Sequence, residues 1–216
     1  MDLYPINTGN LKLDGGAMFG VVPKVIWGKS YPSDENNLCN WSMRCLLIVD
    51  GDRKILIDCG IGNKQPEKFF SNYHLNGDDT LEKSLAAVGF TPDDITDVIL
   101  THLHFDHAGG AVQWNADRSG YEVVFKNATY RTSRRQWEWA TSPNNREKAS
   151  FLKENILPIK EKGRHERHQH HKRHNHLPKN KLLLRRAVEQ GDLVYDFWLL
   201  IHMFLHSILL KHLHHH

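Results

Sequence analysis

Short apolar runs separated by turn residues mark the first half of the chain. Arg44–Asp50 and Arg53–Gly60 are rich in Leu and Ile, and Gly51-Asp52 lies between them. Two such runs around a Gly-containing pair are typical of strands joined by a tight β-hairpin. Because both runs are strongly apolar, we expect each strand to face a core on at least one side.

Helix signals follow this hairpin. Apolar residues recur at helical spacing in Thr80–Phe90, with Asp79 or Thr80 as the capping residue and Gly89 at the end. Thr91–Ile95 repeats a capping residue followed by Pro, which favours the first position of a helix. The segment therefore predicts one short amphipathic helix and a second helical turn.

Strands and helices alternate after these turns. Val98–Leu100 predicts a short buried strand, and Tyr121–Tyr130 predicts another strand with its exit turn. Arg134–Ile159 predicts two helical stretches, broken at Ser142-Pro143, and the run Arg131–Gln136 is interpreted as a solvated face. Strands followed by alternating strands and helices indicate α/β or α+β layers.

The composition changes abruptly after Gly163. The first 163 residues contain 4 His and carry a formal charge of −2, whereas the last 53 contain 12 His and carry +5. Arg164–His176 has no apolar residue and predicts a solvated low-complexity loop. Phe197–Leu213 is apolar but only 17 residues long and interrupted by His and Lys, which favours an amphipathic helix over a membrane anchor.

Charge and cysteine content narrow the classes of function. A formal net charge of +3 over 216 residues is too small to indicate a nucleic-acid partner. Cys39, Cys45 and Cys59 are an odd number without a CxxC pair, so neither a disulfide framework nor a cysteine zinc ribbon is indicated. The N-terminus lacks a basic start followed by an apolar stretch, and we expect a cytoplasmic, reducing location.

A histidine-rich motif, Thr101–Gly110, carries the chemistry. In an extended segment alternate side chains share one side, so His102 and His104 can both offer imidazole nitrogens to one metal ion. Asp106 and His107 follow where the chain turns into a helix and can serve a second ion. Surface histidines on a loop are the alternative, and the strand before the motif argues against it. These residue types suit zinc, or iron or manganese with more oxygen ligands.

The motif THLHFDHAGG resembles the metal motif of the metallo-β-lactamase-fold hydrolases. ILIDCGIGNK (Ile55–Lys64) resembles the strand and glycine turn that precede it in that family. DGGAMFGVVPKVIW (Asp14–Trp27) resembles the opening of the branch that includes quorum-quenching N-acyl homoserine lactonases, and the segments NATYRTSRRQWEWA and NNREKASFLKENILPI resemble its helical insertion. The resemblance covers Met1–Gly163.

This resemblance implies an αββα sandwich with two divalent metal ions, zinc foremost, at the edge between the sheets. His102 and His104 would hold the first ion, and Asp106 and His107 the second. Asp106 would also orient a bridging water and act as the catalytic proton shuttle. Asp58 is the expected carboxylate that contacts a metal-ligating histidine without binding the metal itself, and it would fix the tautomer of that imidazole.

The family pattern also needs later ligands, and no GHTxGH-like turn occurs in the sequence. Asp192, in a Gly-Asp turn after an apolar run, is the candidate bridging ligand, and Tyr195 resembles a substrate-contacting tyrosine of some lactonases. A turn aspartate and a packed tyrosine are the alternatives. Five histidines of the His-rich tract could supply the missing ligand: His168, His170, His171, His174 and His176. His202 and His206 would share a helix face, although the family places its last His in a loop.

These observations predict two parts, an N-terminal metallo-β-lactamase-like portion (1–163) and an atypical His-rich, basic segment (164–216). The predicted function is metal-dependent hydrolysis of a small-molecule ester or lactone, with opening of an N-acyl homoserine lactone-like ring by a metal-bound hydroxide as the leading reaction. No nucleic acid or membrane is expected as a partner. Two alternatives stay open: phosphodiester or thioester hydrolysis on the same centre, and a catalytically silent relative that binds metal. The change at Gly163 also raises the hypothesis of a frameshifted C-terminus, which translation of the other two reading frames would test.

Overall fold

The structure is a computed structural model that describes residues 1–161 and 165–168. Its strands form two sheets, one with six strands and one with two. The strands are β1 (Asp2–Asp14), β2 (Leu38–Asp50), β3 (Arg53–Ile57), β4 (Asp97–Ile99), β5 (Val112–Trp114), β6 (Tyr121–Val123), β7 (Thr129–Ser133) and β8 (His165–His168). The helices are α1 (Gly15–Phe19), α2 (Lys24–Trp27), α3 (Glu67–Ser71), α4 (Leu81–Ala87), α5 (Phe105–Ala108), α6 (Arg134–Thr141) and α7 (Lys153–Glu161), with 3₁₀ turns η1 (Pro92–Asp94) and η2 (Gly109–Ala111).

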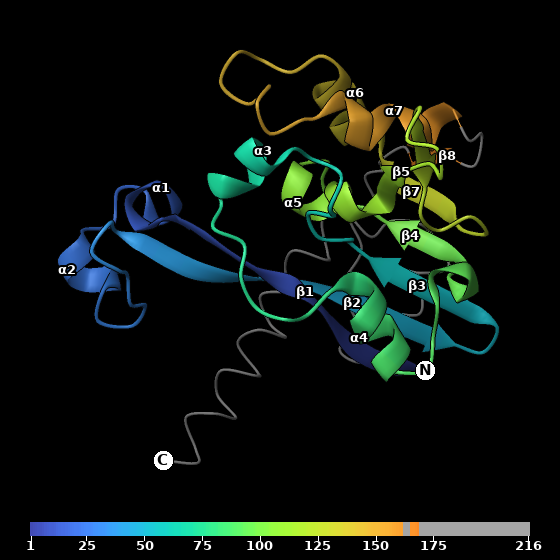
Figure 1. The fold of residues 1–216 in the computed structure, drawn as a ribbon, viewed down its shortest axis with the longest axis horizontal. Coiled ribbons are helices and arrows are strands. Elements are labelled where there is room, and N and C mark those ends of the chain that lie inside the picture. The colour runs from blue at the N-terminus through green and yellow to red at the C-terminus, as the bar shows by residue number, and fades with distance from the viewer. Residues whose placement is uncertain (162–164, 169–216) are drawn as a thin grey trace, which may run out of the picture.

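The larger sheet has the order β1-β2-β3-β4-β7-β8. Its first three strands pair antiparallel, and β3, β4, β7 and β8 run parallel to one another. The carboxyl ends of the parallel strands therefore meet at one edge, where α/β proteins place their ligands. The helices α5, α6 and α7 lie beyond this edge (Figure 1).

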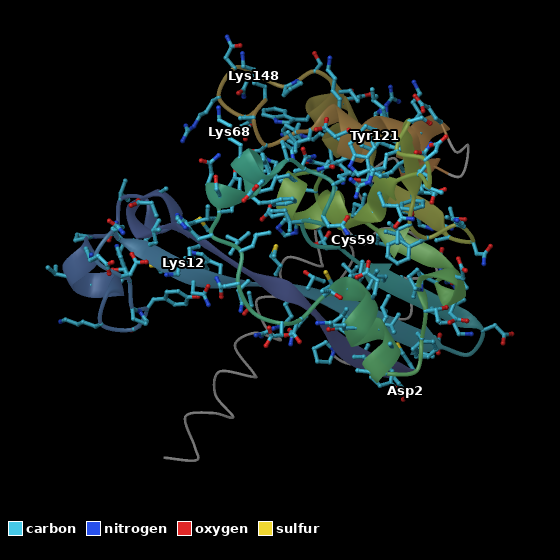
Figure 2. All side chains as sticks on the ribbon, in the orientation of Figure 1. Asp2, Lys12, Cys59, Lys68, Tyr121 and Lys148 are labelled. Atoms are coloured by element: carbon cyan, nitrogen blue, oxygen red, sulfur yellow. The ribbon has the colours of Figure 1, made fainter. Side chains whose placement is uncertain are left out.

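Both faces of the central strands are apolar. Leu56 and Val98 belong to one buried cluster, and their neighbours Ile55, Ile57 and Ile99 belong to another. Successive strand residues point to opposite faces, so the alternation shows a sheet with apolar side chains on each side, as is usual for parallel strands. Cys59 lies in the interior of the body just after β3 (Figure 2), and it is free, like Cys39 and Cys45.

Several local expectations are confirmed. Gly51 has φ +60 in the hairpin between β2 and β3. Thr80 caps α4 by accepting a hydrogen bond from the Lys83 backbone N–H, and Thr91 forms a capping box with Asp94 at the next turn. The two helices predicted within Arg134–Ile159 are α6 and α7.

Other expectations were wrong because long-range partners decide the structure. The strand predicted with its exit turn in Tyr121–Tyr130 is shorter than expected: β6 ends at Val123 and pairs with β5 in the small sheet, and the segment ends in β7, which pairs with β4 in the large one. The run Arg131–Gln136 is not a solvated face: Arg131 pairs with buried Asp97 at 3.0 Å. Part of Arg164–His176, predicted as a loop, is strand β8 beside β7.

The remaining C-terminal expectations, from residue 169 on, lie outside the described residues. These include Asp192, Tyr195, the apolar stretch Phe197–Leu213 and the other histidines of the tract. Among the described residues, no helix is long and apolar enough to cross a membrane. The division into 1–163 and 164–216 stays a prediction.

Two glycines allow the chain after α5 to pack against the turn after β3. A Cβ atom on Gly110 would collide with the Cys59 carbonyl oxygen, and one on Gly109 would collide with that of Ile61. The Gly110 N–H donates to the Gly60 carbonyl at 2.9 Å, so the two segments touch through bare backbone.

We expect Gly110→Ala to lower the free energy of unfolding by about 1–3 kcal/mol, because the new methyl group overpacks this contact. Gly120→Ala is the matched control, since a Cβ there meets only ordinary contact at 3.7 Å. Denaturant unfolding measures both. Equal stability of the two variants would contradict the role given to this contact.

Candidate metal centre

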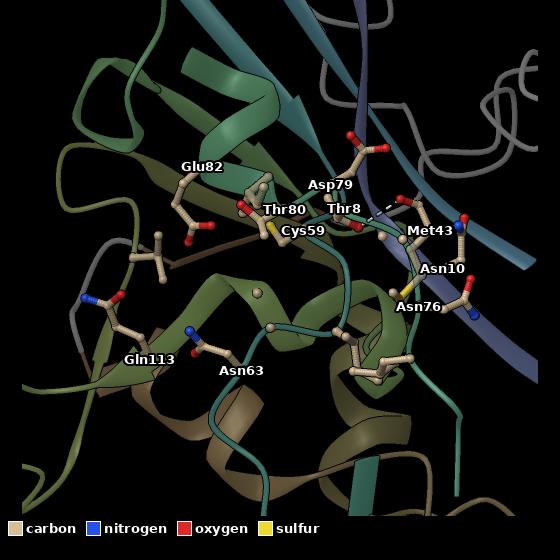
Figure 3. Close-up of a pocket in the computed structure, with 18 of the residues that line it drawn as sticks. Thr8, Asn10, Met43, Cys59, Asn63, Asn76, Asp79, Thr80, Glu82 and Gln113 are labelled. Carbon is tan, nitrogen blue, oxygen red and sulfur yellow. Dashed lines mark hydrogen bonds between the residues drawn. The ribbon is translucent and has the colours of Figure 1, made fainter. Parts of the chain in front are cut away.

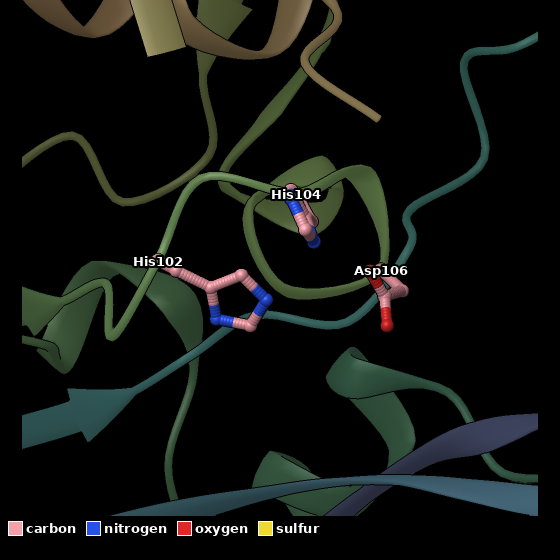
Figure 4. A group of neighbouring side chains, drawn as sticks. All are labelled: His102, His104 and Asp106. Atoms are coloured by element: carbon pink, nitrogen blue, oxygen red, sulfur yellow. The ribbon is translucent and has the colours of Figure 1, made fainter. Parts of the chain in front are cut away.

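The motif side chains gather at the carboxyl end of β4. The chain leaves β4 through Thr101, reaches the start of α5 at His104, and carries Asp106 and His107 on α5. The ligand atoms of His102, His104 and Asp106 all lie within 4.8 Å of one another. Figure 4 shows the three side chains facing a common space.

His107 completes the group from the same helix. Its ring centroid lies 3.9 Å from that of His102, and its Nε2 lies 3.4 Å from the Asp106 carboxylate. The carboxylate of Asp106 is therefore near His107 as well as the His102–His104 pair. The structure brings together all four motif residues, and their division between two ions stays a prediction.

Asp58 links the motif to the end of β3. Its Oδ1 accepts the Thr101 N–H at 2.9 Å, and both of its oxygens lie within 3.0 Å of the Thr101 hydroxyl. Its Oδ2 lies 2.8 Å from His107 Nδ1. A hydrogen bond from Nδ1–H to Asp58 leaves Nε2 turned toward Asp106, which is the tautomer that a metal ligand at Nε2 requires.

The backbone of Asp58 is held in an uncommon conformation. Its φ is +59, which is rare for a residue with a side chain. Hydrogen bonds on both sides fix it there: the Asp58 N–H donates to Ile99, and the Cys59 N–H donates to the His107 carbonyl. Strain of this kind persists where the surrounding structure determines it, and functional sites are the usual place.

The electrostatics favour uncharged imidazoles at two of the positions. Burial and the neighbouring His107 lower the pKa of His102 to about 4, and burial lowers the pKa of His104. Burial opposes charge on His107 too, but hydrogen bonds to Asp106 and Asp58 raise its pKa to about 10. Burial by itself would raise the pKa of Asp106. Its interactions with His107 outweigh burial, so the pKa lies below the ordinary value.

The donor set fits a divalent cation. Neutral imidazole nitrogens and a carboxylate oxygen are the ligands that zinc and related metals take. A protonated His107 would have to release a proton to bind metal, and metal binding commonly has this cost. The residues therefore support divalent metal binding.

Three neighbours of the site were not predicted as functional residues from the sequence. Thr101 holds Asp58, and its hydroxyl lies 3.2 Å from His102 Nδ1. Phe151 packs on the His104 ring with centroids 4.7 Å apart. The Lys64 ammonium is buried and donates to the Gly109 carbonyl at the end of α5. All three lie within segments that resemble the family, Thr101 as the first residue of the motif, but no pattern in the sequence marked a role for them.

A separate cavity adjoins the turn after β3. Its volume is about 260 Å³, and Cys59, Gly62 and Gly110 form part of its wall (Figure 3). The motif side chains are not among its lining residues.

The family model of the metallo-beta-lactamase superfamily matches residues 44–178. The chain belongs to this superfamily. The fold class expected from the sequence is confirmed, and the site lies in the motif on which the resemblance rested. The matched region extends beyond the last described residue.

One curated relative and two solved structures are similar to this chain. An N-acyl homoserine lactonase of Bacillus cereus is 30% identical over 132 residues, which are 56% of this chain and 46% of that protein. A probable metal-dependent hydrolase from Staphylococcus aureus is 36% identical, with a TM-score of 0.68 over 74% of this chain and 57% of that one. AidC, a dizinc quorum-quenching lactonase solved with N-hexanoyl-L-homoserine, is 21% identical and shares the fold (TM-score 0.57, 77% of this chain and 57% of that one). The chain spans about half the length of the curated relatives it matches.

Asp58→Asn should weaken metal binding by about 10- to 100-fold, the usual effect of losing a carboxylate behind a ligating His. The amide keeps the shape of the carboxylate but can offer an N–H to His107 Nδ1, which favours the wrong tautomer. Competition with a chromogenic chelator measures the affinity. Asp52→Asn, at an exposed hairpin position, is the control, and equal affinities of the two variants would contradict the role of Asp58.

Lys64 gives a pH dependence of stability. Burial lowers its pKa from 10.5 to about 8, so between these values the unfolded chain binds more protons than the folded one. The contribution of Lys64 to the free energy of unfolding should therefore rise by up to about 3 kcal/mol from pH 8 to pH 10.5. Lys64→Met should remove this rise and exposed Lys68→Met should keep it, as urea unfolding across this pH range would show. The same pH dependence in both variants would contradict this role of Lys64.

Proposed function

We propose that this protein is a metal-dependent hydrolase that opens the ring of a lactone, with N-acyl homoserine lactones as the substrate class. The clustering of His102, His104, Asp106 and His107 around one space is the observation that carries the proposal. Family membership and the named lactonase relatives support it. The proposed cofactor is a pair of zinc ions.

The four motif residues would hold the ions, and Asp58 would keep His107 in the ligating tautomer. When bound, such ions lower the pKa of water and polarise a carbonyl group. His102 and His104 present neutral imidazoles because burial disfavours their charged forms. Asp192, as bridging ligand, and Tyr195, as substrate contact, complete the proposed site.

Asp106 would move the proton. Ring opening forms a bond from a water oxygen to the lactone carbonyl carbon and breaks the bond from that carbon to the ring oxygen. The Asp106 carboxylate, within reach of the other motif residues, would accept the proton from water and return it to the leaving alkoxide. Its lowered pKa keeps the carboxylate ionised at neutral pH, so its oxygens carry no proton before the reaction.

Asp106→Asn should lower kcat for an N-acyl homoserine lactone by at least about 100-fold, because the amide cannot accept the proton. Exposed Asp117→Asn is the control and should keep the activity of the parent chain. Release of acid from the lactone and metal content are measured on the same samples. The zinc-loaded full chain must be active for the proposal to stand; if it is folded and inert toward lactones, the proposal fails.

A further inference from the structure

Two of the three motif histidines have a hydrogen-bonding group next to Nδ1. Asp58 lies 2.8 Å from His107 Nδ1, and the Thr101 hydroxyl lies 3.2 Å from His102 Nδ1. Ligating histidines usually have such a partner, which fixes the direction of the ring. In the part of the chain that the structure describes, no group forms a hydrogen bond with the His104 imidazole. Packing is therefore the contact that these residues offer to this ring.

Phe151 supplies that packing. Its ring centroid lies 4.7 Å from that of His104, and the two ring planes are inclined by 58°. The ring of His102 is at the same centroid distance from His104, 4.7 Å, and is inclined by 75°. Tilted aromatic pairs at such distances attract each other. Of the two rings that contact His104, that of Phe151 is the one that is not itself a candidate metal ligand.

The position of Phe151 is fixed by contacts outside the motif. Its side chain is buried and belongs to the main apolar cluster, together with side chains of α6 and α7. The N–H of Phe105, the residue after His104, donates to the Ser150 carbonyl at 3.0 Å. The chain before Phe151 is thus bonded to the chain after His104, which holds the two rings next to each other.

The connection between α6 and α7, residues 142–152, is itself attached to its surroundings (Figure 1). Glu147 Oε2 accepts the indole N–H of Trp139, on α6, at 2.8 Å. Gln65, in the turn after β3, donates to Glu154 Oε1, on α7, at 3.1 Å. The segment that carries the phenyl ring is therefore joined to α6 and leads into a helix that is bonded to the turn beside the site.

We propose that Phe151 is a positioning residue for the candidate metal centre and that it holds the His104 imidazole in its ligating direction by aromatic packing. In this role the phenyl ring acts only through His104. An imidazole that is already held in place loses less freedom when it binds a metal ion, so the affinity for the ion is higher. The inference rests on the metal binding of the proposed function, and it does not depend on a lactone as the substrate.

Zinc affinity of the full chain tests this role. Phe151→Leu removes the aromatic ring and keeps an apolar side chain, and we expect it to weaken zinc binding by about 2- to 10-fold, which corresponds to the loss of one aromatic pair. Phe151→Tyr keeps the ring and should bind zinc like the parent chain. Competition with a chromogenic chelator measures the affinities, and circular dichroism establishes that each variant is folded.

Phe125→Leu is the matched control. Phe125 is buried in the same apolar cluster, but its ring contact is with Tyr130 and not with the motif. The control should therefore lower the free energy of unfolding, as Phe151→Leu does, and leave the zinc affinity unchanged. A purely structural role of Phe151 predicts instead that the two leucine variants bind zinc equally.

Nuclear magnetic resonance of the metal-free chain tests the contact without zinc. The ring-proton signals of His104 should carry a ring-current shift that Phe151→Leu removes and Phe125→Leu keeps. The same signals in both variants would overturn the inference. Tight zinc binding by the parent chain that Phe151→Leu fully retains would overturn it while leaving the proposed function intact. No zinc binding by the parent chain would contradict the proposed function and the inference together.

Discussion

The carboxylate of Asp58 holds the candidate metal centre together. It accepts hydrogen bonds from the backbone and hydroxyl of Thr101 and lies 2.8 Å from His107 Nδ1. The end of β3 is thereby joined to both sides of the motif, the loop before α5 and α5 itself. Hydrogen bonds to a buried charged group are stronger than neutral ones, so this one residue fixes the direction of an imidazole and the path of the chain.

The sheet explains why these groups can meet. Because β3 and β4 are parallel neighbours, their carboxyl ends lie side by side, and Asp58 and Thr101 follow those ends directly. Apolar side chains on both faces keep the strands in place, while the backbone contact of Gly110 with Gly60 closes the turn behind the site. The positions of the candidate metal ligands thus depend on packing between residues that are not themselves ligands.

The sequence was most informative where the pattern is local. The hairpin at Gly51, the cap at Thr80 and the spacing of His102 and His104 depend on near neighbours, and the structure contains all three. Strand β1 has no clean apolar run and includes Gly9 at φ +99, so periodicity did not reveal it. In β7, buried Thr132 donates to the Leu100 carbonyl, a contact between distant segments that no local pattern encodes.

Metal analysis of histidine variants tests the central claim most directly. The claim is that the motif, positioned by Asp58, holds divalent metal. His102→Ala/His104→Ala should lower the bound metal by at least one ion per chain, whereas His74→Asn, at an exposed position outside the motif, should leave it unchanged. Equal metal content in the parent chain and both variants would contradict the account.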